Sequence, residues 1–138
     1  MRSQDSISSL LATKGSEIFS VEPSATVYLA IEMMAAHRVG ALLVMDQGKL
    51  VGIISERDYC RRLILKDRAS HTTPVEAIMA SPVITVTPDH TVEDCLRLMS
   101  KKHIRHLPVM QDRAVVGVVT IGDLVHWIVT PAPQAAST

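Results

Sequence analysis

The sequence predicts a mixed α/β (α+β) fold in which one small β-α-β-β-α unit occurs twice in tandem. The first observation is an internal repeat: eleven residues between positions 21 and 58 recur unchanged 65 positions later, without a gap. They are Val21, Pro23, Thr26, Val27, Met34, Leu42, Val44, Met45, Val51, Gly52 and Asp58. The second observation is that both copies show the same order of strand-like and helix-like runs. A chain of 138 residues is long enough for one compact folded unit of this kind.

Each copy opens with a short strand and an amphipathic helix. The strand is predicted over 18–21 and 83–86, where a β-rich run is closed by a proline. Thr26 and Thr91 then stand where a helix N-cap belongs. Apolar residues follow at helical spacing: Val27, Ala30, Ile31 and Met34 in the first copy, and Val92, Cys95, Leu96 and Met99 in the second.

A hairpin and a second helix complete each copy. The hairpin strands are predicted over 41–45 and 50–55 in the first copy, and over 107–110 and 115–120 in the second. The second helix is predicted from 56 to about 65, and from 121 to about 129.

The predicted boundaries follow from these elements. We expect an N-terminal segment over 1–14, a first repeat over 15–66, a linker over 67–80, a second repeat over 81–129 and a flexible tail over 130–138. Thr73-Pro74-Val75-Glu76 in the linker has the pattern of a capping box and predicts a short helix ending near Met79. Because neither copy alone would bury much core, the two small sheets are expected to pack through their helices as a pseudo-two-fold pair.

Composition argues against several classes of protein. Fourteen basic and fourteen acidic residues give no broad positive field, and an aromatic fraction of 3% leaves few stacking platforms for nucleic acid. No apolar run is long enough to span a bilayer, and the N-terminus lacks the apolar stretch of a secretory signal. Two cysteines without a framework are read as reduced thiols. We therefore expect a cytoplasmic protein with no nucleic-acid or membrane partner.

The polar motifs do not predict catalysis. There is no Ser/His/Asp order, phosphate-binding P-loop or CxxC motif, and Ser55 has no evident base partner. His103 and His106 have i, i+3 spacing, but without a third ligand nearby they are a weak metal site. The basic cluster 101–106 is too short to favour nucleic acid. We expect neither an enzyme nor a required metal.

Both copies end in a shared motif that carries a family resemblance. The first copy has Gly52-Ile53-Ile54-Ser55-Glu56-Arg57-Asp58, and the second has Gly117-Val118-Val119-Thr120-Ile121-Gly122-Asp123. The second copy also contains Ile104-Arg105-His106-Leu107-Pro108-Val109. With the repeat, these motifs resemble a tandem pair of CBS (cystathionine-beta-synthase) domains over residues 15 to about 129. The stretch Ser55-Glu56-Arg57-Asp58-Tyr59 is similar to free-standing bacterial CBS-pair proteins.

The resemblance implies a regulatory module rather than a catalyst. Its expected ligand is an adenosine compound (AMP, ADP, ATP, NAD(H) or S-adenosylmethionine), held in clefts between the two copies. It also implies a homodimer that signals to a partner protein, whose identity the sequence does not give. Asp58 and Asp123 would accept hydrogen bonds from the ribose hydroxyls, while Ser55 and Thr120 would face a phosphate at the start of a helix.

Further site residues are carried over by position in the family motif. The cleft of Asp58 is expected to contain Ser55, Arg57, Pro82, Val83, Ile84, Ile104, Arg105 and His106, with Arg105 as the phosphate cation. The cleft of Asp123 is expected to contain Lys14, Glu17, Ile18, Phe19, Val39, Gly40, Ala41 and Thr120. Gly40 is the repeat mate of Arg105, so this second cleft lacks that cation, and Lys14 is a candidate to restore the charge.

Two interpretations stay open. A lone Ser/Thr-x-x-Asp motif is commonly only a helix cap, although two such motifs in phase favour a ligand site. The alternative function is a CBS pair that binds no ligand and acts only as a protein–protein interaction module.

Overall fold

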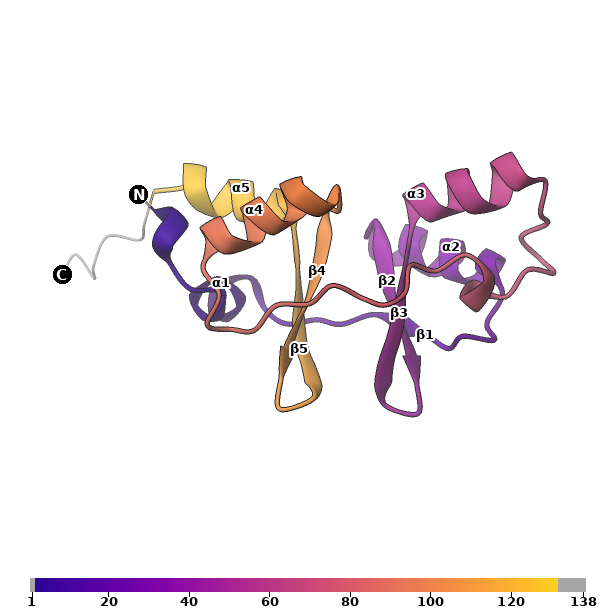
Figure 1. Cartoon of the computed structure of the whole chain (residues 1–138), viewed down its shortest axis with the longest axis horizontal. Coiled ribbons are helices and arrows are strands. Elements are labelled where there is room, and N and C mark those ends of the chain that lie inside the picture. The colour runs from indigo at the N-terminus through magenta and orange to yellow at the C-terminus, as the bar shows by residue number, and fades with distance from the viewer. Residues whose placement is uncertain (1, 132–138) are drawn as a thin grey trace. The chain divides into compact units, whose positions relative to one another are not determined.

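The computed structural model describes residues 2–131, which form two compact units (Figure 1). The central unit is Ile18–Val83. Within the described residues, the split unit combines 2–17 with 84–131, so the N-terminal segment folds with the second repeat. Each unit has a buried cluster of its own, which contrasts with the expectation that one copy alone buries little core. Of the tail expected to be flexible, residues 132–138 lie outside the described part of the chain.

The central unit contains a three-stranded sheet with helices packed against it. Its elements are β1 (Ser20–Val21), α2 (Val27–His37), β2 (Ala41–Asp46), β3 (Lys49–Ser55) and α3 (Glu56–Asp58). Strand β1 pairs in parallel with β2, and β2 pairs antiparallel with β3. The tight turn between β2 and β3 is made by Gln47 and Gly48, both with positive φ, as a two-residue hairpin loop requires. Its core is Val21, Val27, Ala30, Met34, Leu42, Val44, Ile54, Leu63, Val75 and Ile78.

The split unit repeats this plan with a two-stranded sheet. Its elements are α1 (Ile7–Lys14), α4 (Val92–Lys102), β4 (His106–Gln111), β5 (Ala114–Thr120) and α5 (Ile121–Val129). Figure 1 shows α1, α4 and α5 gathered around the β4–β5 hairpin. The helices and the hairpin, together with Val86, form a core of Ile7, Leu10, Val86, Val92, Cys95, Met99, Leu107, Val109, Val119 and Leu124.

The predicted strand over 83–86 is reduced in the structure to a single bridge between Val86 and Val109. The sequence of β4 explains the loss. In the central unit, the N–H of Leu43 donates to the carbonyl of Phe19. The repeat mate of Leu43 is Pro108, which has no N–H, so the corresponding ladder bond cannot form.

Two predictions about short helices were wrong in detail. The expected capping box at Thr73 does not form: the Thr73 hydroxyl donates to the carbonyl of Ala69, and the helix is a 3₁₀ turn, Val75–Ala77, preceded by Pro74. The expected helix over 56–65 is α-helical only over α3 and then continues as a π-helical turn, Tyr59–Leu63, and a 3₁₀ turn, Ile64–Lys66. Helix α5 matches its predicted range.

Helix α1 was not predicted, although its sequence carries a helix signal. Ser6 caps it by accepting a hydrogen bond from the N–H of Ser9, and Ile7, Leu10 and Leu11 have the i, i+3, i+4 spacing of one helical face. The serines within the run obscured that pattern. Ile7 and Leu10 are buried in the core of the split unit.

The internal symmetry extends beyond the repeat detected in the sequence. The N–H of Ile7 donates to the carbonyl of His90, and the N–H of Val75 donates to the carbonyl of Ala25, which is the repeat mate of His90. Helix α1 and the linker turn Val75–Ala77 therefore occupy equivalent positions in their units. These two segments share little sequence, so only the structure relates them.

Candidate functional site

Asp58 is the third residue of α3, the short helix that directly follows the last strand of the central sheet. Its carboxylate Oδ2 accepts hydrogen bonds from the N–H of Ser55, at 3.0 Å, and from the Ser55 hydroxyl, at 3.0 Å. In return, the N–H of Asp58 donates to Ser55 Oγ at 3.2 Å. The Asp58 side chain is only 13% exposed. This reciprocal capping box fixes the carboxylate where the β3 strand turns into a helix.

Asp123 holds the same position in the split unit. Its Oδ2 accepts from the N–H of Thr120 at 2.9 Å, and its own N–H donates to the Thr120 hydroxyl at 3.0 Å. Here the capped helix is α5, which is nine residues long. The Asp123 side chain is 25% exposed and so more accessible than that of Asp58. Both predicted aspartates are thus placed identically within their own units.

Lys14 is brought to Asp123 by helix α1. Its ammonium lies 2.5 Å from Asp123 Oδ2 and donates to the carbonyl of Val118 at 2.8 Å. Lys14 is the last residue of α1, and the helix ends at Gly15, whose φ of 93° favours glycine. Lys14, predicted to bring a positive charge to the Asp123 site, therefore lies on the Asp123 carboxylate itself. Met79 lies 65 positions after Lys14 in the sequence, but the residue that packs on Gly117 as Met79 packs on Gly52 is Leu11.

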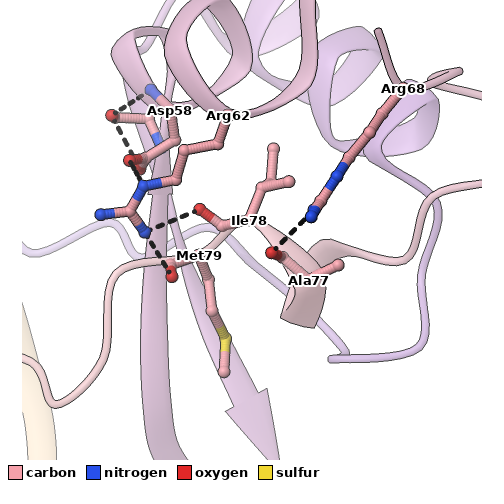
Figure 2. Close-up of polar contacts among 7 residues, drawn as sticks. Asp58, Arg62, Arg68, Ala77, Ile78 and Met79 are labelled. Carbon is pink, nitrogen blue, oxygen red and sulfur yellow. Dashed lines mark hydrogen bonds and ion pairs between the residues drawn. The ribbon is translucent and has the colours of Figure 1, made fainter. Parts of the chain in front are cut away.

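The central unit has a different cation near its aspartate. Arg62 Nε lies 3.7 Å from Asp58 Oδ1, and the same guanidinium donates to the carbonyls of Ile78, at 3.2 Å, and Met79, at 3.0 Å (Figure 2). Arg68 similarly donates to the carbonyl of Ala77 at 3.2 Å (Figure 2). The two arginines satisfy carbonyls at and just after the 3₁₀ turn Val75–Ala77. Arg62 was missed from the sequence, although its i, i+4 spacing from Asp58 was a usable signal.

Arg105 and its repeat mate Gly40 each lie beside the start of the second helix of their own unit. The carbonyl of Arg105 accepts the N–H of Ile121, the first residue of α5, and the carbonyl of Gly40 accepts the N–H of Glu56, the first residue of α3. The Arg105 side chain is exposed. In the antiparallel pairing of β4 with β5, His106 lies opposite Thr120.

The remaining predicted residues are placed as follows. Ala41 faces Ser55 across the β2–β3 pair. Val39, Val83, Ile84 and Ile104 are half-buried, and Glu17, Arg57 and Pro82 are exposed. Ile18 is 37% exposed. The ring of Phe19 stacks on His37, with centroids 3.9 Å apart and 15° between the ring planes.

Residues 2–131 contain neither a metal-binding cluster nor a membrane-spanning helix. Within that range no group of three histidine, cysteine or acidic side chains is arranged to hold a metal ion. No helix in the same range is long and apolar enough to cross a membrane.

Comparison with known proteins agrees with the repeated fold. The family model for the CBS domain matches twice, over residues 8–65 and 75–130. The chain therefore belongs to the CBS domain family, as a tandem pair. Proteins built on CBS pairs are regulatory modules.

Individual relatives support the same assignment. The chain is 45% identical over 109 residues to "CBS domain-containing protein CBSX3, mitochondrial" of Arabidopsis thaliana, an alignment that covers 75% of this chain but only 53% of that protein. A solved structure of a protein with CBS domains from Burkholderia ambifaria superposes with a TM-score of 0.89 at 36% identity, covering 94% of this chain and 99% of that one.

One similar structure contains ligands. The CBS domain pair of protein MJ0100, solved in complex with 5′-methylthioadenosine and S-adenosyl-L-methionine, has a TM-score of 0.77 at 29% identity. The match covers 89% of this chain and 94% of that one. That neighbour thus binds adenosine compounds on the same fold.

Proposed function

We propose that this chain is a regulatory module that binds an adenosine nucleotide at the sites of Asp58 and Asp123. The observation that carries the proposal is the same carboxylate in the same capping box at the end of both β3 and β5. A carboxylate accepts hydrogen bonds at both oxygens, so it can hold its cap and still receive the ribose hydroxyls. The adenosine ligands of the MJ0100 pair support this ligand class.

The remaining site residues are proposed from their match to the family pattern. For the Asp58 ligand, Ser55, Arg57, Ile104 and His106 line the site with Pro82, Val83 and Ile84, and Arg105 contacts the phosphate. For the Asp123 ligand, the lining is Glu17, Ile18, Phe19, Val39, Gly40, Ala41 and Thr120, and Lys14 supplies the cation. We further propose that ligand binding is signalled through a homodimer to a partner protein in the cytoplasm.

The direct test is a binding panel of AMP, ADP, ATP, NADH and S-adenosylmethionine followed by thermal unfolding and calorimetry. A ligand that binds only the folded chain adds RT ln(1 + [L]/Kd) to the free energy of unfolding, about 2.7 kcal/mol at a hundredfold excess over Kd. Asp58→Ala and Asp123→Ala should each remove one binding event. If millimolar concentrations of all five compounds leave the melting temperature unchanged, the sensing function is wrong.

Matched variants separate ligand binding from helix capping. Ser55→Ala and Thr120→Ala remove the hydroxyl that caps the helix but keep the carboxylate. If the carboxylates bind ribose, the aspartate variants lose much more affinity than the hydroxyl variants at equal cost in stability. Equal losses in the two sets would contradict a direct ribose contact.

Arg105→Ala tests the assignment of the phosphate cation. A charge-assisted hydrogen bond contributes about 1.5–3 kcal/mol, so affinity should fall by a factor of about 10 to 150 at one site. Loss of the event that Asp58→Ala also removes supports the proposal. Loss of the Asp123 event instead would assign Arg105 to the helix start that its carbonyl contacts.

The dimer is tested by the mass in solution. The exposed apolar side chains Ile64, Leu65, Val125 and Val129 suit contact with a second copy. Light scattering should give twice the chain mass of 15.1 kDa at micromolar concentration. A monomer mass with and without ligand would refute the dimer.

A second function is favoured by the capping boxes themselves. Each aspartate already accepts hydrogen bonds from a capping residue, which gives it a structural role without a ligand. The chain would then be a ligand-free CBS pair that acts as a protein–protein interaction module. A negative binding panel together with a stable dimer would favour this function.

A further inference from the structure

The carboxylate of Asp123 is already occupied by a cation of the same chain. Asp123 Oδ2 receives the Lys14 ammonium at 2.5 Å as well as the N–H of Thr120 at 2.9 Å. The ammonium also donates to the carbonyl of Val118. The Lys14 side chain is 34% exposed, so the ion pair is partly withdrawn from water. A ribose whose two hydroxyls bound both carboxylate oxygens would have to compete with Lys14 for Oδ2.

The position of Lys14 is fixed by the packing of its helix. The N–H groups of Ile7 and Ser8 donate to the carbonyls of His90, at 2.8 Å, and Pro88, at 3.0 Å. Ile7 and Leu10 are buried in the core of the split unit. The backbone of Lys14 is thereby tied to the unit that contains Asp123. Moving the ammonium off the carboxylate requires rotation about the bonds of its four-carbon side chain and no movement of α1.

Among residues 2–131, no cation comparable to Lys14 contacts the capped oxygen of Asp58. Asp58 Oδ2 accepts from the N–H and hydroxyl of Ser55, which are neutral donors. Arg62 approaches only the other oxygen, at 3.7 Å, and is held by the carbonyls of Ile78 and Met79. Within the described part of the chain, a competing ammonium is therefore found at Asp123 and not at its repeat mate.

From these contacts we propose that Lys14 determines the specificity of the Asp123 site. Its ammonium leaves the Asp123 carboxylate and pairs with a phosphate of the ligand. A ligand with a phosphate near its ribose offers the ammonium a new partner, so Asp123 becomes available to the ribose without leaving a cation unpaired. An uncharged nucleoside whose two ribose hydroxyls used both carboxylate oxygens would have to displace Lys14 from Oδ2, and it offers the ammonium no anionic partner in return. The site therefore selects nucleotides over nucleosides. This inference rests on the proposed function, because it assumes that Asp123 is a ribose-binding residue.

The test compares AMP with adenosine, which differ only in the phosphate. The single tryptophan of the chain, Trp127, lies in α5 four residues after Asp123, so its fluorescence reports on this unit. The variants are Lys14→Met, which keeps the length of the side chain and removes the charge, and Lys14→Arg, which keeps the charge. Lys102→Met is the matched control, because Lys102 is also an exposed lysine at the end of a helix of the same unit, α4.

We expect the wild-type chain to bind AMP at least tenfold more tightly than adenosine. In Lys14→Met the ratio of the two affinities should fall to within about threefold, with AMP weakened and adenosine strengthened. Lys14→Arg and Lys102→Met should keep most of the wild-type ratio. Strengthened adenosine binding is a result that simple loss of structure would not produce.

The contrary outcomes separate this inference from the proposed function. If AMP binds the wild-type chain but Lys14→Met leaves the ratio unchanged, or weakens both ligands equally, the specificity role of Lys14 is wrong and the proposed function stands. If neither AMP nor adenosine binds the wild-type chain, the proposed ligand class fails and this inference fails with it.

Discussion

Leu11 lies over Gly117 so closely that its Cδ2 is 2.8 Å from the point where a β-carbon at position 117 would sit. The repeat mate Gly52 is covered in the same way by Met79, whose Cγ lies 2.9 Å from the corresponding point. In both units a glycine in the last strand lets a neighbouring segment, α1 or the linker, pack against the sheet. The glycine of the repeated motif is thus explained by close packing.

We predict that Gly117→Ala destabilises the chain by about 1–3 kcal/mol, because the methyl group overlaps Leu11. Shortening Leu11 should relieve the overlap, so Gly117→Ala combined with Leu11→Ala should cost less than the sum of the single variants. Denaturant unfolding of the four proteins measures this coupling.

Gly122→Ala is the control for the glycine prediction. The nearest atom to a β-carbon there is Thr120 Oγ1, at 3.6 Å, and the residue lies in the first turn of α5. Alanine should be neutral or stabilising by up to about 1 kcal/mol at a helical position. If Gly117→Ala were equally harmless, the close packing of α1 on β5 would be wrong.

The two cysteines should differ sharply in reactivity. Cys60 is exposed, whereas Cys95 is fully buried. Burial raises the pKa of the Cys95 thiol to about 12, and the neighbouring charge of Asp94 adds to the shift. Since the thiolate is the reactive form, Ellman's reagent at pH 8 should titrate one thiol in the native chain and two in denaturant. Cys60→Ser should leave no fast-reacting thiol, and a fast-reacting thiol in that variant would contradict the buried position of Cys95.

Asp94 should stabilise helix α4 only while it is ionised. The N–H of Thr91 donates to its carboxylate and lowers the pKa of Asp94 below the ordinary value of 3.8. Because the folded-state pKa is depressed, the stabilisation is complete above that ordinary value and is lost as the pH falls through the folded-state pKa. Asp94→Asn should therefore lower the melting temperature at pH 7, and the difference from wild type should shrink in acid.

Asp112→Asn serves as the control for Asp94. Asp112 is exposed in the β4–β5 turn with a φ of 51°, a conformation that asparagine also tolerates. Its substitution should change the melting temperature little at pH 7. A penalty for Asp94→Asn that stays constant down to the acid transition would show that the carboxylate charge does not contribute.

Arg62 should stabilise the central unit through its contacts with the linker. Arg62→Met removes the hydrogen bonds to the carbonyls of Ile78 and Met79 and the contact with Asp58 (Figure 2). Because the side chain is half exposed, water screens these contacts, and we expect a loss of about 1 kcal/mol in the free energy of unfolding. Arg61→Met, at the exposed neighbouring position, should have a smaller effect in the same denaturant titration. Equal effects would contradict a structural role for Arg62.

Much of the fold was determined by local sequence. The in-phase identities predicted two copies, and the capping residues Thr26, Thr91 and Thr120 predicted where three helices begin. These features depend on spacing along the chain and on hydrogen bonds between residues three apart, which a sequence displays directly. The positions of Asp58 and Asp123 at the strand ends followed from the same local rules.

The tertiary structure alone decided which segments complete each unit. Helix α1 joins the second repeat and the linker turn joins the first, although the two segments share little sequence. Their positions are set by long-range backbone hydrogen bonds and by contact with Gly117 and Gly52. The tertiary structure also brings the Lys14 ammonium to the Asp123 carboxylate, a contact between residues 109 positions apart in the chain. Such a contact depends on how helices pack, which local periodicity does not encode.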